Sequence, residues 1–212
     1  MKIDNFSIAD FDKNKFDKYH LGNKVLYDLC NNYPSHTKLD EIHAKIWLIG
    51  RSYAASIERR KKKQQINDEF YDFVIEKFLK FNKEYNFDSK LKAIKMKEFN
   101  HESLGDILAI HKKLIEFFHS LTGLEKRSLA SKYLHFHAPI FPIYDSRVNN
   151  SIRKIVKGKL PKLNGDKQYS EFCSKISFLY NFIKSNSNKA PTMREIDAYL
   201  VKIANENLKS DL

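Results

Sequence analysis

Residues that interrupt helices are scarce in this chain. Among 212 residues there are only six glycines and five prolines, the two residue types that most often end a helix. Apolar residues recur at intervals of three and four over long stretches, as they do on the buried face of a helix. Alternation typical of a strand is confined to residues 141–144. The pattern predicts an all-α fold of about eight helices.

The strongest apolar stripe runs from Leu39 to Ile57, with steps of three or four residues throughout. Thr37 with Asp40, and Thr192 with Glu195, have the spacing of a capping box at a helix start. The expected helices cover residues 24–31, 39–57, 67–81, 102–119, 125–136, 145–157, 169–183 and 192–203.

The length suits one domain with its own hydrophobic core, and we expect residues 1–212 to form it. No apolar run approaches the roughly 20 residues that span a bilayer, and no secretory signal is visible at the start. The two cysteines, Cys30 and Cys173, are far apart and match neither a disulfide framework nor a zinc motif. We therefore expect a cytoplasmic protein without a metal or cofactor.

The charge balance is strongly basic. Lysine and arginine number 38 against 26 acidic residues, a formal charge of +12, and five basic residues are consecutive at 59–63. Such a balance favours a phosphate-rich partner. The alternative is compositional bias, because the chain is also rich in Asn, Ile, Phe and Tyr, as proteins of AT-rich genomes are.

Residues 121–148 differ from the rest of the chain. Gly123 divides two predicted helices and can take a positive φ close to a ligand. Lys126 and Arg127 follow in the first turn of the next helix, where cations are unfavourable. We interpret this as a site for an anion at the helix start; the alternative is that both side chains are simply solvated.

Lys132 and Asp145 are the two candidate catalytic groups. Lys132 lies among apolar residues, where desolvation would lower its pKa and provide a neutral amine as nucleophile; the alternative is a lysine whose stem covers the core. Asp145 follows a linker braced by two prolines and is expected to be the N-cap of the next helix. We expect the rigidly held carboxylate to face back toward the preceding helix and an electron-deficient centre of a substrate; the alternative is that Asp145 serves only as the N-cap.

The order of helix, Gly turn, helix with lysine, Pro-containing linker and aspartate resembles the helix-hairpin-helix DNA glycosylase superfamily. The segments Ser131–Phe136 and Phe141–Val148 are similar to bacterial proteins with an 8-oxoguanine DNA glycosylase fold, and residues 192–200 resemble their closing helix. The similarity covers about 28 residues in the middle of the chain and about nine near its end.

The resemblance implies two helical subdomains with a cleft between them, and a catalytic segment at about 104–157. The hairpin, with Thr122, Gly123, Lys126 and Arg127, binds the DNA backbone while the target base is flipped into the cleft. In bifunctional members a lysine attacks the sugar C1′ and an aspartate stabilises the developing positive charge.

This chain departs from the family pattern in two respects. Its hairpin has one glycine instead of two. Lys126 lies 19 residues before Asp145, close to the family's usual interval, whereas Lys132 lies 13 before it in the closer local match. The two lysines are six positions apart and point to different sides of a helix. The nucleophile is either of them, or Asp145 activates water in a monofunctional enzyme.

Four further residues complete the predicted site. Arg147, in the first turn after Asp145, is expected to contact phosphate. Trp47, Arg51 and Tyr53 are expected to line a base pocket, since aromatic and guanidinium planes stack on bases; the alternative is a core tyrosine and a solvated arginine.

The sequence thus predicts a monomeric DNA glycosylase acting on double-stranded DNA with a modified base, in repair or against modified foreign DNA. A non-catalytic helical DNA-binding module and a basic interaction protein are the alternatives.

Overall fold

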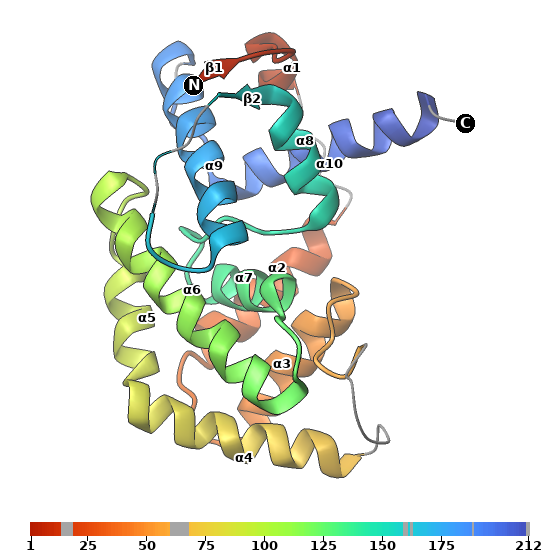
Figure 1. The fold of residues 1–212 in the computed structure, drawn as a ribbon. Helices are drawn as coiled ribbons and strands as arrows, with labels where there is room; N and C mark the ends of the chain where they lie inside the picture. The colour runs from red at the N-terminus through yellow and green to blue at the C-terminus, as the bar shows by residue number, and fades with distance from the viewer. Residues whose placement is uncertain (14–18, 60–67, 159–160, 162, 188, 211–212) are drawn as a thin grey trace.

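The computed structural model describes residues 1–13, 19–59, 68–158, 161, 163–187 and 189–210 (Figure 1). These residues form ten helices and one small sheet, which confirms the predicted all-α class. In chain order the helices are α1 (Ile8–Lys13), α2 (His20–Asn32), α3 (Leu39–Ser52), α4 (Asp68–Tyr85), α5 (Phe87–Lys95), α6 (His101–Thr122), α7 (Arg127–His137), α8 (Ser146–Ile155), α9 (Lys167–Asn186) and α10 (Met193–Ser210).

The sheet was not predicted. Strands β1 (Lys2–Ile3) and β2 (Val156–Lys157) pair antiparallel. Each strand has only two residues, so no alternation of side chains marks it in the sequence. The pairing joins the start of the chain to the end of α8 (Figure 1).

The helix predicted over residues 39–57 is shorter than its stripe. α3 ends at Ser52, Ala54 has a φ of +48°, and the chain then turns back so that Ile57 is fully buried. A Cβ on Gly50 would lie 2.9 Å from the Cα of Ser56, so glycine is required where the returning segment crosses α3. The stripe continued because both segments face the same core.

The two predicted capping boxes have different outcomes. At α10 the box is confirmed: the Thr192 N–H donates to Glu195 Oε2 at 2.7 Å and the Glu195 N–H donates to Thr192 Oγ1 at 3.1 Å. At α3 the prediction is wrong, because Lys38 is the N-cap and no side chain caps it. The basic residues 60–63 and Asn67, the first residue of the helix predicted over 67–81, lie outside the described residues.

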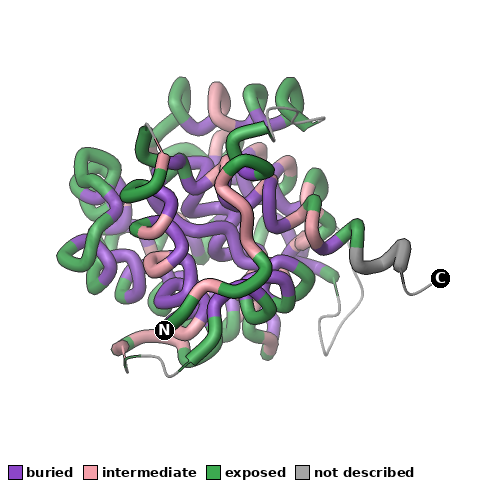
Figure 2. The backbone as a smooth tube through the Cα atoms, turned by 90° about the horizontal axis from the view of Figure 1, so that it is seen from above, coloured by how far each residue is buried: buried purple, intermediate pink, exposed green. Residues whose placement is uncertain are grey.

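α7 lies at the centre of the molecule, and all residues from Leu129 to His137 are buried. It packs against α2, α3, α5 and α6. α8 packs against α9 and most extensively against α10. Figure 2 shows the buried residues in the interior of this arrangement, with exposed residues around it. The central position of α7 brings its polar side chains, Lys132 among them, into the interior of the molecule.

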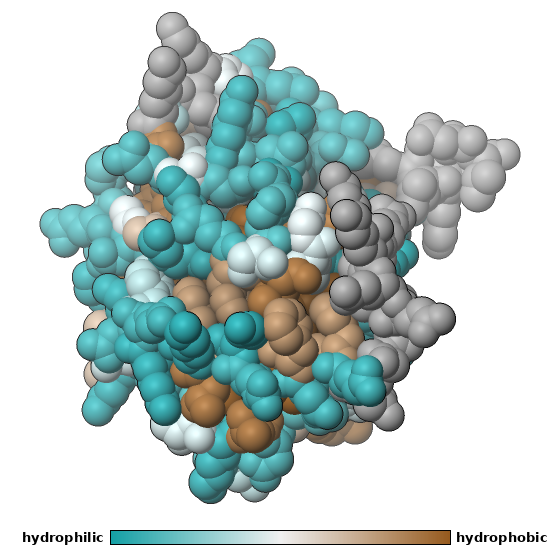
Figure 3. Space-filling view, turned by 60° about the horizontal axis from the view of Figure 1, so that its bottom comes forward, coloured by the Kyte–Doolittle hydropathy of each residue, from teal (hydrophilic) through white to brown (hydrophobic). Residues whose placement is uncertain are grey.

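The end of the molecule formed by α4 presents a different surface. Apolar side chains gather in the middle of that face (Figure 3). Among the helices that the structure describes, none combines the length and apolar character that a bilayer span requires.

Candidate active site

The turn between α6 and α7 has the predicted glycine geometry. Gly123 is the C-cap of α6 with a φ of +68°, and its N–H donates to His119 O at 2.8 Å. The buried Thr122 hydroxyl donates to Phe118 O at 2.8 Å and accepts from the Leu124 N–H at 3.2 Å. Thr122 therefore stabilises the turn from inside, whereas Gly123 is exposed.

Lys126 and Arg127 have partners within the protein. Arg127 pairs with Glu125, and its Nε lies 2.6 Å from Asp166 Oδ1. The Lys126 amine donates to Arg59 O at 2.5 Å. The inference that these cations await an external anion is corrected for Arg127, because two carboxylates of the chain already neutralise it.

Hydrogen bonds to buried side chains hold the linker between α7 and α8. The Tyr144 N–H donates to Ser131 Oγ at 2.9 Å, and His135 Nδ1 lies 2.7 Å from Phe141 O. Because Nδ1 faces a carbonyl oxygen, it carries the proton of this ring. Both contacts tie the linker to α7 and fix the position of Asp145, which follows it.

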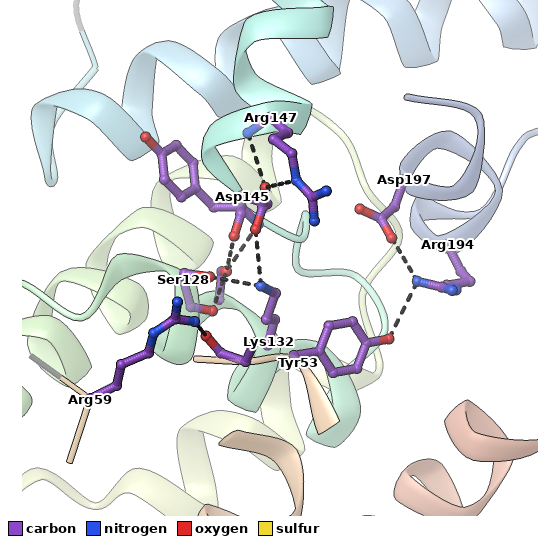
Figure 4. A network of polar contacts seen from close by, with 11 residues as sticks. Tyr53, Arg59, Ser128, Lys132, Asp145, Arg147, Arg194 and Asp197 are labelled. Carbon is purple, nitrogen blue, oxygen red and sulfur yellow. Dashed lines mark hydrogen bonds and ion pairs between the residues drawn. The ribbon is translucent and has the colours of Figure 1, made fainter. Parts of the chain in front are cut away.

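Asp145 is the N-cap of α8, as predicted. Its Oδ1 accepts from the Arg147 N–H at 2.9 Å. Its other oxygen, Oδ2, is directed at Lys132 on α7 (Figure 4). The carboxylate thus caps one helix and contacts a cation on another.

The Lys132 amine lies at the meeting point of three groups. It is 2.7 Å from Ser128 Oγ, 3.4 Å from Asp145 Oδ2 and 5.3 Å from the centroid of the Tyr53 ring. Its side chain is only 4% exposed, against 29% for Asp145. Burial lowers the pKa of Lys132, and the charge of Asp145 opposes this shift. The amine is therefore easier to deprotonate than that of a solvated lysine.

Lys132 and Asp145 line a cleft of about 750 Å³. Its walls come from α2, the segment after α3, α7, the start of α8, and α10. The Tyr53 hydroxyl donates to Asn23 Oδ1 at 2.6 Å, and Arg194 Nη1 lies 2.6 Å from Asp197 Oδ2 and 3.4 Å from the Tyr53 oxygen. The cleft thus has a wall of linked polar side chains, one of which, Tyr53, lies beside Lys132 (Figure 4).

The structure brings some of the predicted site residues together and not others. The cleft is lined by Lys132, Asp145, Arg147 and Tyr53. The predicted residues that do not line it are Thr122, Gly123, Lys126, Arg127, Trp47 and Arg51.

The base-pocket prediction is corrected for two residues of α3. Trp47 is exposed on the surface of α3. Arg51 Nη2 lies 2.6 Å from Glu58 Oε1, and its guanidinium lies 5.8 Å from the Trp47 ring. This ion pair holds Arg51 at Glu58, so that of the three predicted pocket residues Tyr53, which follows the end of α3, lines the cleft.

Sequence reasoning missed Asn23, Arg194 and Asp197. Arg194 and Asp197 could have been identified from the sequence. They lie three residues apart at the start of the last helix, in the segment that carries the family resemblance. Asn23 had no signal, since one polar residue in a helix has no distinguishing pattern.

The arrangement combines a buried amine, a carboxylate and a cleft lined by both. Within the part of the chain that the structure describes, no three His, Cys, Asp or Glu side chains are grouped to hold a metal ion. Comparisons with protein-family models, with curated proteins and with solved structures find no match to this chain.

Proposed function

We propose that this protein is a DNA glycosylase that flips a modified base out of double-stranded DNA and excises it, with lyase activity at the resulting site. The observation that carries the proposal is the buried Lys132 amine 3.4 Å from the Asp145 carboxylate on the wall of a cleft. A lysine with a lowered pKa is an activated nucleophile, and a cleft of this size accommodates an extruded nucleotide.

Lys132 acts on the sugar. Its neutral amine attacks C1′, the C1′–N bond breaks, and the electron pair leaves with the base, which takes a proton from solvent. The nitrogen now bonded to C1′ gives one proton to solvent. The bond between C1′ and the ring oxygen then breaks, the ring oxygen takes its electron pair and a proton from solvent, and the nitrogen lone pair forms the C1′=N bond of a protonated imine. Ser128, at 2.7 Å, orients the amine through its hydroxyl oxygen.

Asp145 stabilises the positive charge that develops on the sugar as the base departs. Its charge is held in position by the capping bond to α8 and by the linker that ends at Tyr144. Preorganised charges of this kind act on the transition state without further reorganisation. In a monofunctional version of the reaction, Asp145 activates a water in place of the amine.

DNA approaches through the turn at Gly123, whose backbone is exposed, and through Arg147 at the cleft. In this proposal residues 1–212 form one glycosylase-like domain with two helical subdomains, and residues 104–157 supply the hairpin and the catalytic pair. The protein acts as a monomer in the cytoplasm, at the nucleoid, either in base-excision repair or against modified foreign DNA.

A non-catalytic DNA-binding module is the competing function. The Lys132–Asp145 ion pair would then only brace α7 against α8. The test is release of bases from a panel of duplexes, each with one oxidised, deaminated or alkylated base, followed by detection of strand cleavage. Release by the wild type and loss in Asp145→Asn support the glycosylase. Tight binding to every duplex without release from any supports the module.

A further inference from the structure

We infer that the outer face of α8, with the sheet at its end, is a phosphate-binding surface that holds the DNA backbone beside the cleft. We name it the α8 basic strip; it consists of Arg147, Arg153, Lys154, Lys157 and Lys2. The inference rests on the proposed function for the choice of DNA, but it concerns a different surface from the hairpin.

The residue pattern of α8 separates charge from core. Its apolar residues Val148, Ile152 and Ile155 are buried, whereas its cations are exposed. No acidic residue occurs between Ser146 and Ile155. Arg147 and Lys154 are seven positions apart and so share one face of the helix, about 10 Å apart at 1.5 Å per residue.

Like charges are crowded at the end of the strip. Lys2 lies directly opposite Lys157 in the antiparallel pair, an arrangement that is destabilising for like charges. On neighbouring α9, burial lowers the pKa of Lys175, and the charges of Arg153 and Lys157 lower it further. A bound polyanion would relieve this repulsion.

The cations of the α8 basic strip form fewer and longer ion pairs with carboxylates than Arg127 of the hairpin does. Arg153 lies 3.4 Å from Glu171, and Arg147 lies 3.8 Å from Asp145. Lys154 and Lys157 form no ion pair with any carboxylate of the described ranges. By contrast, two carboxylates hold Arg127 on the hairpin. Phosphates can therefore bind Lys154 and Lys157 without first displacing a carboxylate of the described residues.

The strip is continuous with the cleft. Arg147 lines the cleft beside Asp145, and α8 leads from there to the sheet at the end of the molecule (Figure 1). Along one DNA strand a phosphate recurs about every 3.4 Å of helix axis. The distance from Arg147 to Lys154 therefore corresponds to about three phosphates next to the nucleotide in the cleft.

The test is a salt series of binding to a fluorescently labelled duplex that contains no modified base. The variant Lys154→Ala/Lys157→Ala is compared with Lys83→Ala/Lys92→Ala, which removes two exposed lysines of α4 and α5. Each lost phosphate contact reduces the slope of log K against log salt by about 0.9. We expect the strip variant to lose about two units of slope and roughly 10- to 100-fold in affinity at 0.1 M salt, and the control to keep the wild-type slope.

Equal slopes for the two variants would overturn the inference. Vesicles of anionic phospholipid form a second arm: loss of vesicle binding in the strip variant with an unchanged DNA slope would assign the strip to a membrane surface and also overturn it. Because the duplex is unmodified, the result is independent of base release. If the wild type releases no base but the strip variant shows a smaller slope of log K against log salt, the proposed function is refuted and the DNA-binding surface stands.

Discussion

The Nζ of Lys132 lies 3.4 Å from the Oδ2 of Asp145, across the gap between α7 and the start of α8. A buried ion pair contributes little net stability, because the cost of desolvating both charges offsets their attraction. The fold therefore gains little from keeping a lysine at this position of its central helix. The proposed function accounts for the pair through chemistry in the cleft that it lines.

Asp145→Asn is expected to abolish base release without unfolding the protein. Asparagine is as good an N-cap as aspartate, so the bond to the Arg147 N–H survives. The lost charge no longer stabilises a cationic sugar, and removal of such electrostatic stabilisation typically reduces a rate by about 100-fold or more. Single-turnover excision and thermal unfolding, measured side by side, separate the two effects.

Asp106→Asn is the matched control for that variant, because it removes an exposed carboxylate of α6, paired with Lys97, that does not line the cleft. It should leave excision unchanged. Wild-type excision by Asp145→Asn would reduce Asp145 to a helix cap and refute the proposed site.

The rate of the lysine-dependent step should rise with pH and level off at a lower pH than it would for a solvated lysine. A solvated lysine has a pKa of 10.5, and burial lowers that of Lys132. The neutral amine, which is the reactive form, therefore accumulates below pH 10.5. The measurement is a pH profile of single-turnover strand cleavage, corrected for denaturation. A rate that is still climbing at pH 10.5 would show that Lys132 is not the titrating group.

Local patterns predicted the parts of this structure that depend on nearby residues. The helices follow from apolar periodicity, and the N-cap role of Asp145 and the positive φ of Gly123 follow from their residue types. The helix α5 was missed, because it starts after Asn86 in a left-handed conformation that this residue tolerates but does not require.

Contacts between distant segments were not predictable from one sequence. Strand β2 pairs with residues at the opposite end of the chain, and Asn23 reaches Tyr53 from another helix. Periodicity assigns a residue to the core side of its own helix but not to a neighbour. For the same reason the sequence could not decide between Lys126 and Lys132 as the partner of Asp145. The packing of α7 on the linker is what places Lys132 beside Asp145.

Substitution by alanine should change the stability of the fold in opposite directions at two glycines, Gly105 inside α6 and Gly123 at its C-cap. Neither Gly105 nor Gly123 has an atom within 4 Å of an added Cβ, so no clash contributes. Gly105 is inside α6, where alanine stabilises by roughly 0.5–1 kcal/mol. Gly123 has a φ of +68°, a conformation that costs a residue with a Cβ about 1–2 kcal/mol.

Thermal unfolding should therefore show a raised midpoint for Gly105→Ala and a lowered one for Gly123→Ala. Gly123→Asn should lose less than Gly123→Ala, because asparagine tolerates the left-handed region. A stabilising Gly123→Ala would mean that the turn does not have this geometry in solution.

The fold should lose stability in mild acid because His135 is buried in its neutral form. Burial lowers its pKa from 6.5 to about 4, so between those values the unfolded chain binds a proton that the folded state does not. The free energy of unfolding then falls as the pH drops from 6.5 toward 4, by roughly 3 kcal/mol for this residue. The buried His111, with a pKa of about 3, adds to the effect.

Urea unfolding at pH 7.5 and pH 5 measures this loss. His135→Gln cannot titrate, so its stability should depend less on pH even though the contact to Phe141 is weakened. His101→Gln, at an exposed position, should retain the wild-type dependence. Identical pH dependence in both variants would contradict the assignment to His135.

Lys132 is expected to form a reducible imine with DNA. Borohydride converts the imine to a secondary amine, so it should trap a covalent adduct between the wild type and a duplex whose modified base is excised. Lys132→Ala should give no adduct, and Lys132→Arg should also fail because arginine stays protonated. Lys126→Ala should still give the adduct, since that amine is hydrogen-bonded to Arg59 O outside the cleft.

Loss of trapping only in Lys126→Ala would transfer the role of nucleophile to Lys126. Base release without an adduct in any variant would indicate a monofunctional enzyme in which Asp145 activates water.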